Sequence, residues 1–344
     1  MLDKQSTNAT SAKIRAMYAD MFTIDNYREL MSKKSVPDAA EYLSRHPGFR
    51  DAFRETDPNT IHRGYLEELI GRENFETYIR VIKFQGLDKQ PFYSFLLRKN
   101  EVMTILSAIN KINSSLEVTA LPELPGYLIK HLGSRVLDIA AAETYSELLQ
   151  ILKGTQYYKV LSKVPLREDG KADFTECELR LRNNYYAGLL EQAEKGFDKS
   201  SAEELKSLIL KEIDCRNIVN AYRMKAYFGY SADEIKRRSL KFSGIGKRTM
   251  DRIYESEDGE QMLELINKTA YGKNSPDTDN IEVKINSVKI RRLRSVLTNS
   301  TSAAASVYAF VQLCDIEAAN IIRIIEGIRY GVEPAVIESQ LVTL

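Results

Sequence analysis

The stretch AFVQLCDIEAANIIRIIEGIRYGVEPAVIESQLV, residues 309–342, sets the fold because its pattern is written earlier in the chain. Residues 212–218 read EIDCRNI where residues 315–321 read DIEAANI, at an offset of 103 residues. An internal repeat fixes an architecture more firmly than the propensity of any single segment. The sequence therefore predicts a fold built from similar units.

The strongest match between the two copies is an acidic residue followed three positions later by Asn. Asp214 and Asn217 hold these positions in one copy, and Glu317 and Asn320 hold them in the other. Residues three apart lie on one side of a helix. The pair therefore predicts the same side-chain arrangement at two places in the structure.

A fainter third copy lies in residues 95–109, FLLRKNEVMTILSAI. Glu101 falls where Asp214 falls, and Thr104 replaces the Asn. The loop after this copy also lacks the glycine that follows the other two. The sequence predicts a third unit whose boundary is less regular.

Each copy carries an apolar helical face, which in the last copy is formed by Cys314, Ala318, Ile321, Ile325 and Ile328. Spacings of three and four residues are those of a buried helix face.

Helix-end signals follow that face in the last two copies. Gly331 and Gly229 suit a left-handed residue at a helix end, and Pro334 suits the start of a new helix. Ser231 with Glu234 has the spacing of a capping box, as does Ser201 with Glu204.

A second landmark also occurs three times, as a short helix followed by an aromatic residue. The aligned apolar positions and the aromatics that follow them are Leu43, Leu152 and Ile266, then Phe49, Tyr157 and Tyr271. Because two separate landmarks recur in the same order, we interpret the chain as three repeats.

Composition points to an all-α fold. The 344 residues include only 17 Gly and 9 Pro, with 43% hydrophobic residues. Residues 281–288, IEVKINSV, alternate briefly, and we interpret them as the start of a helix. The charges nearly cancel, with 49 basic and 48 acidic residues, which argues against a globally basic nucleic-acid binder.

No set of residues carries a catalytic or metal-binding pattern, so we expect no catalytic, cofactor or metal residues. His46, His62 and His131 lack a second ligand at metal spacing, and we expect them on the surface or in loops. Cys177, Cys215 and Cys314 form no CxxC pair, and we expect them to be buried, reduced thiols.

One alternative rests on the basic turn FSGIGKRTMDRI, residues 242–253. It fails as a Walker A loop because position 241 is Lys and Arg248 separates Lys247 from Thr249. It is closer to a helix–hairpin–helix turn, whose backbone amides would hold a DNA phosphate. A helical nucleic-acid-binding scaffold is therefore the alternative function.

Two long segments resemble the C subunit of the V/A-type rotary ATPases, which is similar to the vacuolar d subunit. They are NIIRIIEGIRYGVEPAVIESQLV at 320–342 and KIRAMYADMFTIDNYRELMSKKSVPDAAEYLSRHPGF at 13–49. The resemblance implies three similar helical domains around a pseudo-threefold axis, in the shape of a funnel. The repeats place them at residues 7–115, 116–229 and 230–344.

The resemblance also implies a mechanical role. A protein of this family is a non-catalytic part of the central stalk, a socket that joins the shaft to the membrane rotor ring for proton or sodium transport. Its partners would be the D-type and F-type shaft subunits and the proteolipid ring, at one copy per complex, with no nucleic acid or small-molecule substrate. The first residues lack an apolar core and no run of 18 apolar residues occurs, so we expect no signal peptide and no membrane span. The resemblance implies a cytoplasmic protein that is peripheral on the membrane as part of the rotary complex.

Overall fold

Short helices followed by a pair of long helices recur along the chain. The computed structural model describes residues 4–114 and 125–343. Within those ranges the regular structure is helical, apart from one isolated bridge between Leu166 and Ala172. The predicted all-α class is confirmed.

Three pairs of long helices form the centre of the molecule. They are α4 (Arg63–Lys83) with α5 (Phe95–Asn113), α10 (Phe174–Gly196) with α11 (Lys199–Phe228), and α16 (Ile281–Asn299) with α17 (Ala303–Arg329). Helix α5 packs on α10, α10 on α11, α11 on α16 and α16 on α17, and α17 also packs on α4 and α11. The chain therefore returns to its own beginning.

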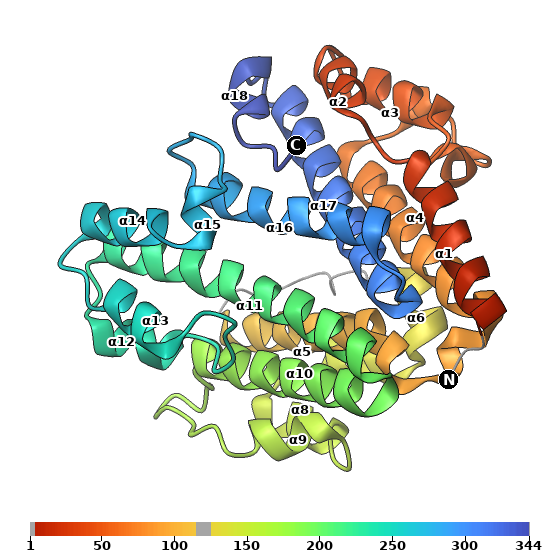
Figure 1. Ribbon diagram of the computed structural model, residues 1–344. Helices are drawn as coiled ribbons and strands as arrows, with labels where there is room; N and C mark the ends of the chain where they lie inside the picture. Colours follow the sequence, from red (N-terminus) through yellow and green to blue (C-terminus); the bar gives the residue numbers. More distant parts are fainter. Residues whose placement is uncertain (1–3, 115–124, 344) are drawn as a thin grey trace.

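Short helices lie outside the long ones in three groups (Figure 1). The first holds α1 (Lys4–Ala19), α2 (Ile24–Met31) and α3 (Val36–Arg45), and the second holds α6 (Gly126–Leu132), α7 (Arg135–Ala141), α8 (Tyr145–Ile151) and α9 (Gln156–Leu161). The third holds α12 (Ala232–Arg238), α13 (Lys247–Tyr254), α14 (Gly259–Asn267) and α15 (Ala270–Lys273), and α18 (Pro334–Glu338) follows α17. Short 3-10 turns at Arg50–Phe53, Pro58–Thr60, Phe84–Lys89 and Pro91–Ser94 connect elements of the first group and its long helices.

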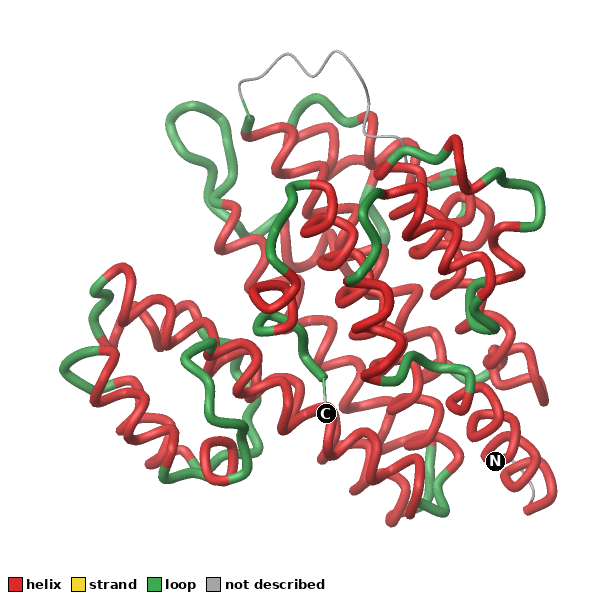
Figure 2. Tube along the Cα trace, turned by 90° about the horizontal axis from the view of Figure 1, so that it is seen from above, coloured by secondary structure: helices red, strands yellow, loops and turns green. Residues whose placement is uncertain are grey.

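The α12–α15 group stands out as a separate lobe on the end of α11. Seen from above, it projects to the left of the other helices (Figure 2). Its core joins the second half of α11 to α13, α14 and the start of α16, through residues such as Ile218, Ile253 and Ile285. The remainder of α11 belongs to the large central core.

The two ends of the chain share one core. Leu30 and Leu43, from α2 and α3, pack in the same cluster as Ile321 and Ile325 of α17. Arg28 Nε lies 3.2 Å from Glu338 Oε1 of α18, which adds an ion pair between the ends. The lobe around the second half of α17 is therefore assembled from both termini.

Helix ends follow the predicted signals at most places. Gly229 and Gly331 adopt left-handed φ values of 63° and 64°, and α18 begins at Pro334. The capping box of Ser231 and Glu234 is present.

The capping box predicted at Ser201 and Glu204 is wrong. Asp198 caps α11 by accepting a hydrogen bond from the Ser201 backbone N–H. Glu204 instead accepts a hydrogen bond from Ser300 Oγ at 2.5 Å, because its position in the first turns of α11 faces the start of α17.

Candidate functional site

The repeated Asn makes the same contact in both copies. The Asn217 side chain donates to the Leu240 carbonyl at 3.1 Å and accepts from the Leu240 N–H at 2.9 Å. Asn320 makes the same two bonds with Val342, at 3.0 and 3.1 Å. A buried amide paired in this way fixes a returning chain segment against the long helix.

The repeated acid is held by the repeated aromatic in two of the three copies. Tyr157 donates its hydroxyl to Glu101 at 2.5 Å, and Tyr271 donates its hydroxyl to Asp214 at 2.8 Å. The two landmarks found separately in the sequence are thus partners in space.

The last copy, with Glu317, lacks this bond because Phe49 has no hydroxyl. Glu317 accepts a hydrogen bond from the Phe22 backbone N–H at 2.5 Å. Burial raises the pKa of Glu317 to about 7, although the Phe22 bond lowers it. This carboxyl therefore keeps its proton to a higher pH than an ordinary glutamate does.

Three matched positions on the long helices form a polar cluster. Two residues before each repeated acid stand Lys99 on α5, Glu212 on α11 and Asp315 on α17. Lys99 Nζ lies 2.6 Å from Asp315 Oδ2. Burial works to lower the pKa of Lys99, but the charges of Asp315 and Glu212 outweigh it and the pKa is raised. Two acids from different helices thus share one lysine.

Tyrosines complete this cluster. Glu212 accepts hydrogen bonds from Tyr186 at 2.9 Å and from Tyr308 at 2.5 Å. Burial would raise the pKa of Glu212, but Lys289, Lys99 and these hydroxyls lower it. The Lys99 and Asp315 side chains remain 33% and 21% exposed. The cluster joins helices α5, α10, α11 and α17 and still presents charge to the surface.

The basic turn at 242–253 already uses its backbone amide. The Gly244 N–H donates to both oxygens of Asp214, at 3.2 and 3.0 Å, and Ser243 donates to the same carboxylate. A DNA phosphate would compete with that buried carboxylate for the same donor. The turn is thus built as a structural link between α13 and α11.

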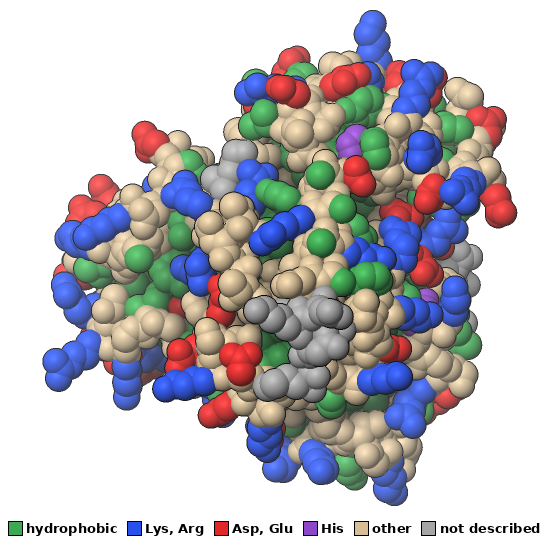
Figure 3. Space-filling model, turned by 45° about the vertical axis from the view of Figure 1, so that its right-hand side comes forward, with side chains coloured by type: hydrophobic (Ala, Val, Ile, Leu, Met, Phe, Trp, Pro, Cys, Tyr) green, Lys and Arg blue, Asp and Glu red, His purple; other side chains and the backbone are tan. Residues whose placement is uncertain are grey.

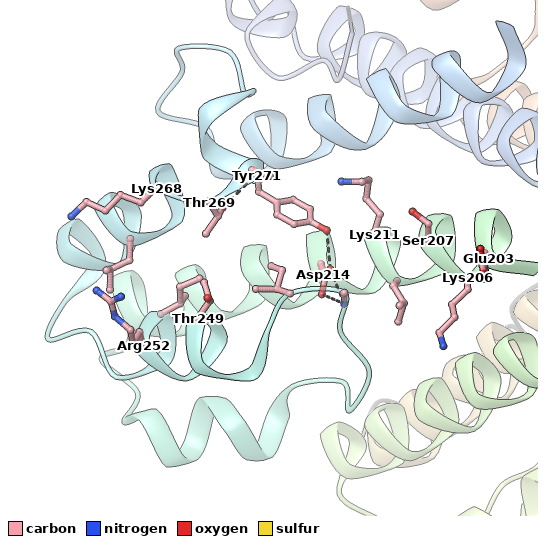
Figure 4. A pocket seen from close by; sticks show the side chains of 16 residues that line it. Glu203, Lys206, Ser207, Lys211, Asp214, Thr249, Arg252, Lys268, Thr269 and Tyr271 are labelled. Carbon is pink, nitrogen blue, oxygen red and sulfur yellow. Dashed lines mark hydrogen bonds between the residues drawn. The ribbon is translucent and has the colours of Figure 1, made fainter. Parts of the chain in front are cut away.

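Beside this turn lies a cavity of about 810 Å³. Its lining comes from α11, the turn and helices α13 to α15 (Figure 4). The Tyr271 hydroxyl points to Asp214 at its back, and Lys206, Lys211, Arg252 and Lys268 stand around it. We refer to this cavity as the α11 groove.

The predicted cysteine and histidine roles can now be placed. Cys177, Cys215 and Cys314 are free and buried, as predicted. His62 caps α4 and His46 follows α3. His131 instead lies in the last turn of α6 and is half-buried against Phe75, contrary to the surface or loop position that we predicted. In the part of the chain that the structure describes, no group of three His, Cys, Asp or Glu could hold a metal ion.

The visible surface carries charges of both signs. Lys and Arg side chains are mixed with Asp and Glu over most of the face in Figure 3, and Lys and Arg predominate along its lower edge. Among the described helices, only α17 is long and apolar enough to cross a membrane, and 78% of its most apolar window is buried inside the protein. Its apolar character is therefore accounted for by the core.

Comparison with known proteins identifies the family. The model of the ATP synthase (C/AC39) subunit family matches residues 10–340. The chain belongs to this family. It is similar to the C subunit of the A-type ATP synthase of Pyrococcus abyssi, with 22% identity over 96% of this chain and 89% of that protein. The corresponding C subunit of Desulfurococcus sp. is 26% identical over 94% of this chain and 87% of that protein.

Proposed function

We propose that this chain is a non-catalytic central-stalk subunit of a V/A-type rotary ATPase, which couples the shaft to the membrane rotor ring. The observation that carries the proposal is the family match over residues 10–340. The chain would act within a membrane-associated complex as a peripheral subunit, in one copy, and would carry no catalytic site of its own.

The proposed arrangement is a funnel of three repeats at residues 7–115, 116–229 and 230–344. Each of these segments holds a group of short helices followed by one pair of long helices. The shared contacts of Asn217 and Asn320, and of Glu101 and Asp214, support the equivalence of the units. An axis near Lys99, Glu212 and Asp315 would relate them.

Stiffness is what torque transmission requires from such a protein. The Lys99–Asp315 ion pair and the Glu212 hydrogen bonds tie helices from all three long pairs together. Close-packed helical cores resist deformation. The three walls would present non-identical surfaces to the D-type and F-type shaft subunits, since the repeats keep their core positions and differ elsewhere.

Native mass spectrometry of this chain mixed with the shaft subunits tests the proposal. We expect a one-to-one complex that tolerates moderate salt, because the net charge of +1 provides no strong global attraction. Absence of that complex, together with tight and salt-sensitive binding of duplex DNA, would favour the nucleic-acid scaffold instead.

A further inference from the structure

Two grooves lie at matched positions along α11 and α17. The α11 groove is lined by Ser207, Lys211 and Asp214, and a second cavity is lined by the residues 103 positions later, Phe310, Cys314 and Glu317. The opposite walls also match, with Tyr271 in one and Phe49 in the other. The two grooves are thus versions of one structural feature, and we name the second the α17 groove.

The chain covers the α17 groove with its own N-terminal helix. Helix α1 packs on α17, and Lys13 and Met17 of that helix line what remains of the cavity. Ile14 of α1 is fully buried. The space left is about 310 Å³, compared with about 810 Å³ in the α11 groove. An amphipathic helix is therefore the kind of element that this groove accepts.

The α11 groove is open and has an apolar floor with a basic rim. Leu210, Ile245, Ile253 and Leu265 contribute apolar surface to its lining. The cations around it are Lys206, Lys211, Arg252 and Lys268, with Glu203 as the one acid besides Asp214. Across residues 4–114 and 125–343, none of these four cations forms a salt bridge with an acid.

We propose that the α11 groove binds an acidic amphipathic helix of a partner protein, seated as α1 is seated on α17. Apolar side chains of that helix would cover the floor, and its carboxylates would pair with Lys206, Arg252 and Lys268 at the rim. Recognition of one apolar helix face by a groove with charged flanks is a common mode of peptide binding. This inference depends only on the groove and goes beyond the proposed function.

Charge excludes the helix α1 of a second copy as the occupant. Helix α1, KQSTNATSAKIRAMYA, contains Lys and Arg but no acidic residue. It would meet the basic rim with like charge, which costs binding energy. The α17 groove therefore indicates that the occupant is a helix, and the basic rim of the α11 groove indicates that this helix is acidic.

The groove is pre-organised for such a ligand. Asp214 on α11 holds both walls at once, through Gly244 of the turn and Tyr271 of α15. Lys211 Nζ lies 4.4 Å from the centroid of the Tyr271 ring, which fixes part of the rim. Binding then costs little reordering of the lobe.

The test is fluorescence anisotropy with a labelled synthetic helix of about 20 residues, with Leu on one face and Glu on the other. We expect the whole chain to bind it, and K206E/R252E/K268E to weaken binding by about tenfold or more. The matched control, R237E/K247E/R248E, changes the net charge by the same amount at positions outside the groove and should bind normally.

A second variant tests the shape without changing charge. Ser207→Phe copies Phe310 of the filled groove into an exposed position of the open one, and should block the peptide while melting as the wild type does. The proposal is overturned if both groove variants bind the Glu peptide like the wild type. It is also overturned if a peptide with Lys in place of Glu, or duplex DNA, binds the groove while the Glu peptide does not.

Discussion

The lobes around α11 and α17 use the same parts and differ in how the chain supplies them. The α11 lobe is continuous in sequence, from α11 to the start of α16, and its acid, Asp214, receives a tyrosine hydroxyl and a turn amide. The α17 lobe combines both termini, and its acid, Glu317, faces a phenylalanine at the tyrosine position. Where the two chain ends pack together, the groove is covered by α1 and the pKa of Glu317 is raised.

Comparison of the two lobes separates the contacts that both contain from those that differ. The Asn bonds to a returning segment are kept in both lobes, whereas the acid–tyrosine bond and the openness of the groove vary. The kept features hold each long helix to its own lobe. The varied features lie where α1 packs on α17 and where the α11 groove stays open.

Ile325→Asp should give the largest effect, since it places an unpaired charge in the core shared by both termini. Ile325 is fully buried, so we expect a loss of about 4 kcal/mol or more in the free energy of unfolding. The matched change Tyr222→Asp, at a half-buried position of α11, should cost clearly less. Thermal melts of both variants measure the two losses of stability. Equal losses would contradict the difference in burial between the α17 and α11 positions.

Glu317→Gln should stabilise the protein at high pH. The pKa of Glu317 is about 7 in the fold against an ordinary 4.5, so the folded state keeps its proton longer than the unfolded chain. Wild-type stability is therefore full below pH 4.5 and falls as pH rises towards 7, by up to about 3 kcal/mol. The Gln variant should escape this loss at pH 8 and match the wild type at pH 4.

Urea unfolding at the two pH values measures that effect. Phe49→Tyr is a useful companion, because it offers Glu317 the hydroxyl that Tyr271 offers Asp214. A Gln variant that is no more stable than the wild type at pH 8 would show that Glu317 ionises without cost.

Asn217→Ala and Asn320→Ala should cost similar amounts, because each removes two buried hydrogen bonds to a returning segment. We expect about 2 kcal/mol for each. Thr104→Ala, at the matched position of the first copy, should cost less, since the Thr104 hydroxyl donates to the Asn100 carbonyl of its own helix and fixes no returning segment among the described residues. Denaturant unfolding of the three variants would refute the equivalence if the two Asn changes differed by more than about 1 kcal/mol.

Lys99→Met should have the smallest effect of the series. It leaves Asp315 and Glu212 without their shared cation, but the Lys99 side chain is 33% exposed and water screens the remaining acids. We expect a loss of about 1–2 kcal/mol, greater at pH 8 than at pH 4. If Lys99→Met melts at the same temperature as the wild type at both pH values, the polar cluster does not contribute to stability.

The matched positions on the long helices could be found in the sequence because their landmarks are local and strongly patterned. The matched Asn and acid positions, the left-handed Gly229 and Gly331 and the buried cysteines all follow from spacing and residue type. Tyr271 and Asp214 were each identified in the sequence as a matched position, but the two residues are 57 positions apart and their hydrogen bond was not predicted. That bond depends on which faces of α11 and α15 pack together, and no local pattern gives this.

Other features depend on tertiary contacts that no local pattern encodes. The shared core of both termini arises because α2 and α3 pack on α17, nearly the whole chain away. The Ser201 cap prediction failed since Asp198, three residues earlier, is an equally good cap residue and the Glu204 side chain has a tertiary partner. The cover of the α17 groove likewise depends on the packing of α1 on α17.

We propose that this chain joins the shaft to the membrane ring on the axis of a rotary ATPase. An electron cryomicroscopy map of the purified native assembly tests it most directly. We predict one copy on the axis between shaft and ring, with Lys99, Glu212 and Asp315 near that axis. Several copies, or a single copy on the periphery away from both shaft and ring, would contradict it.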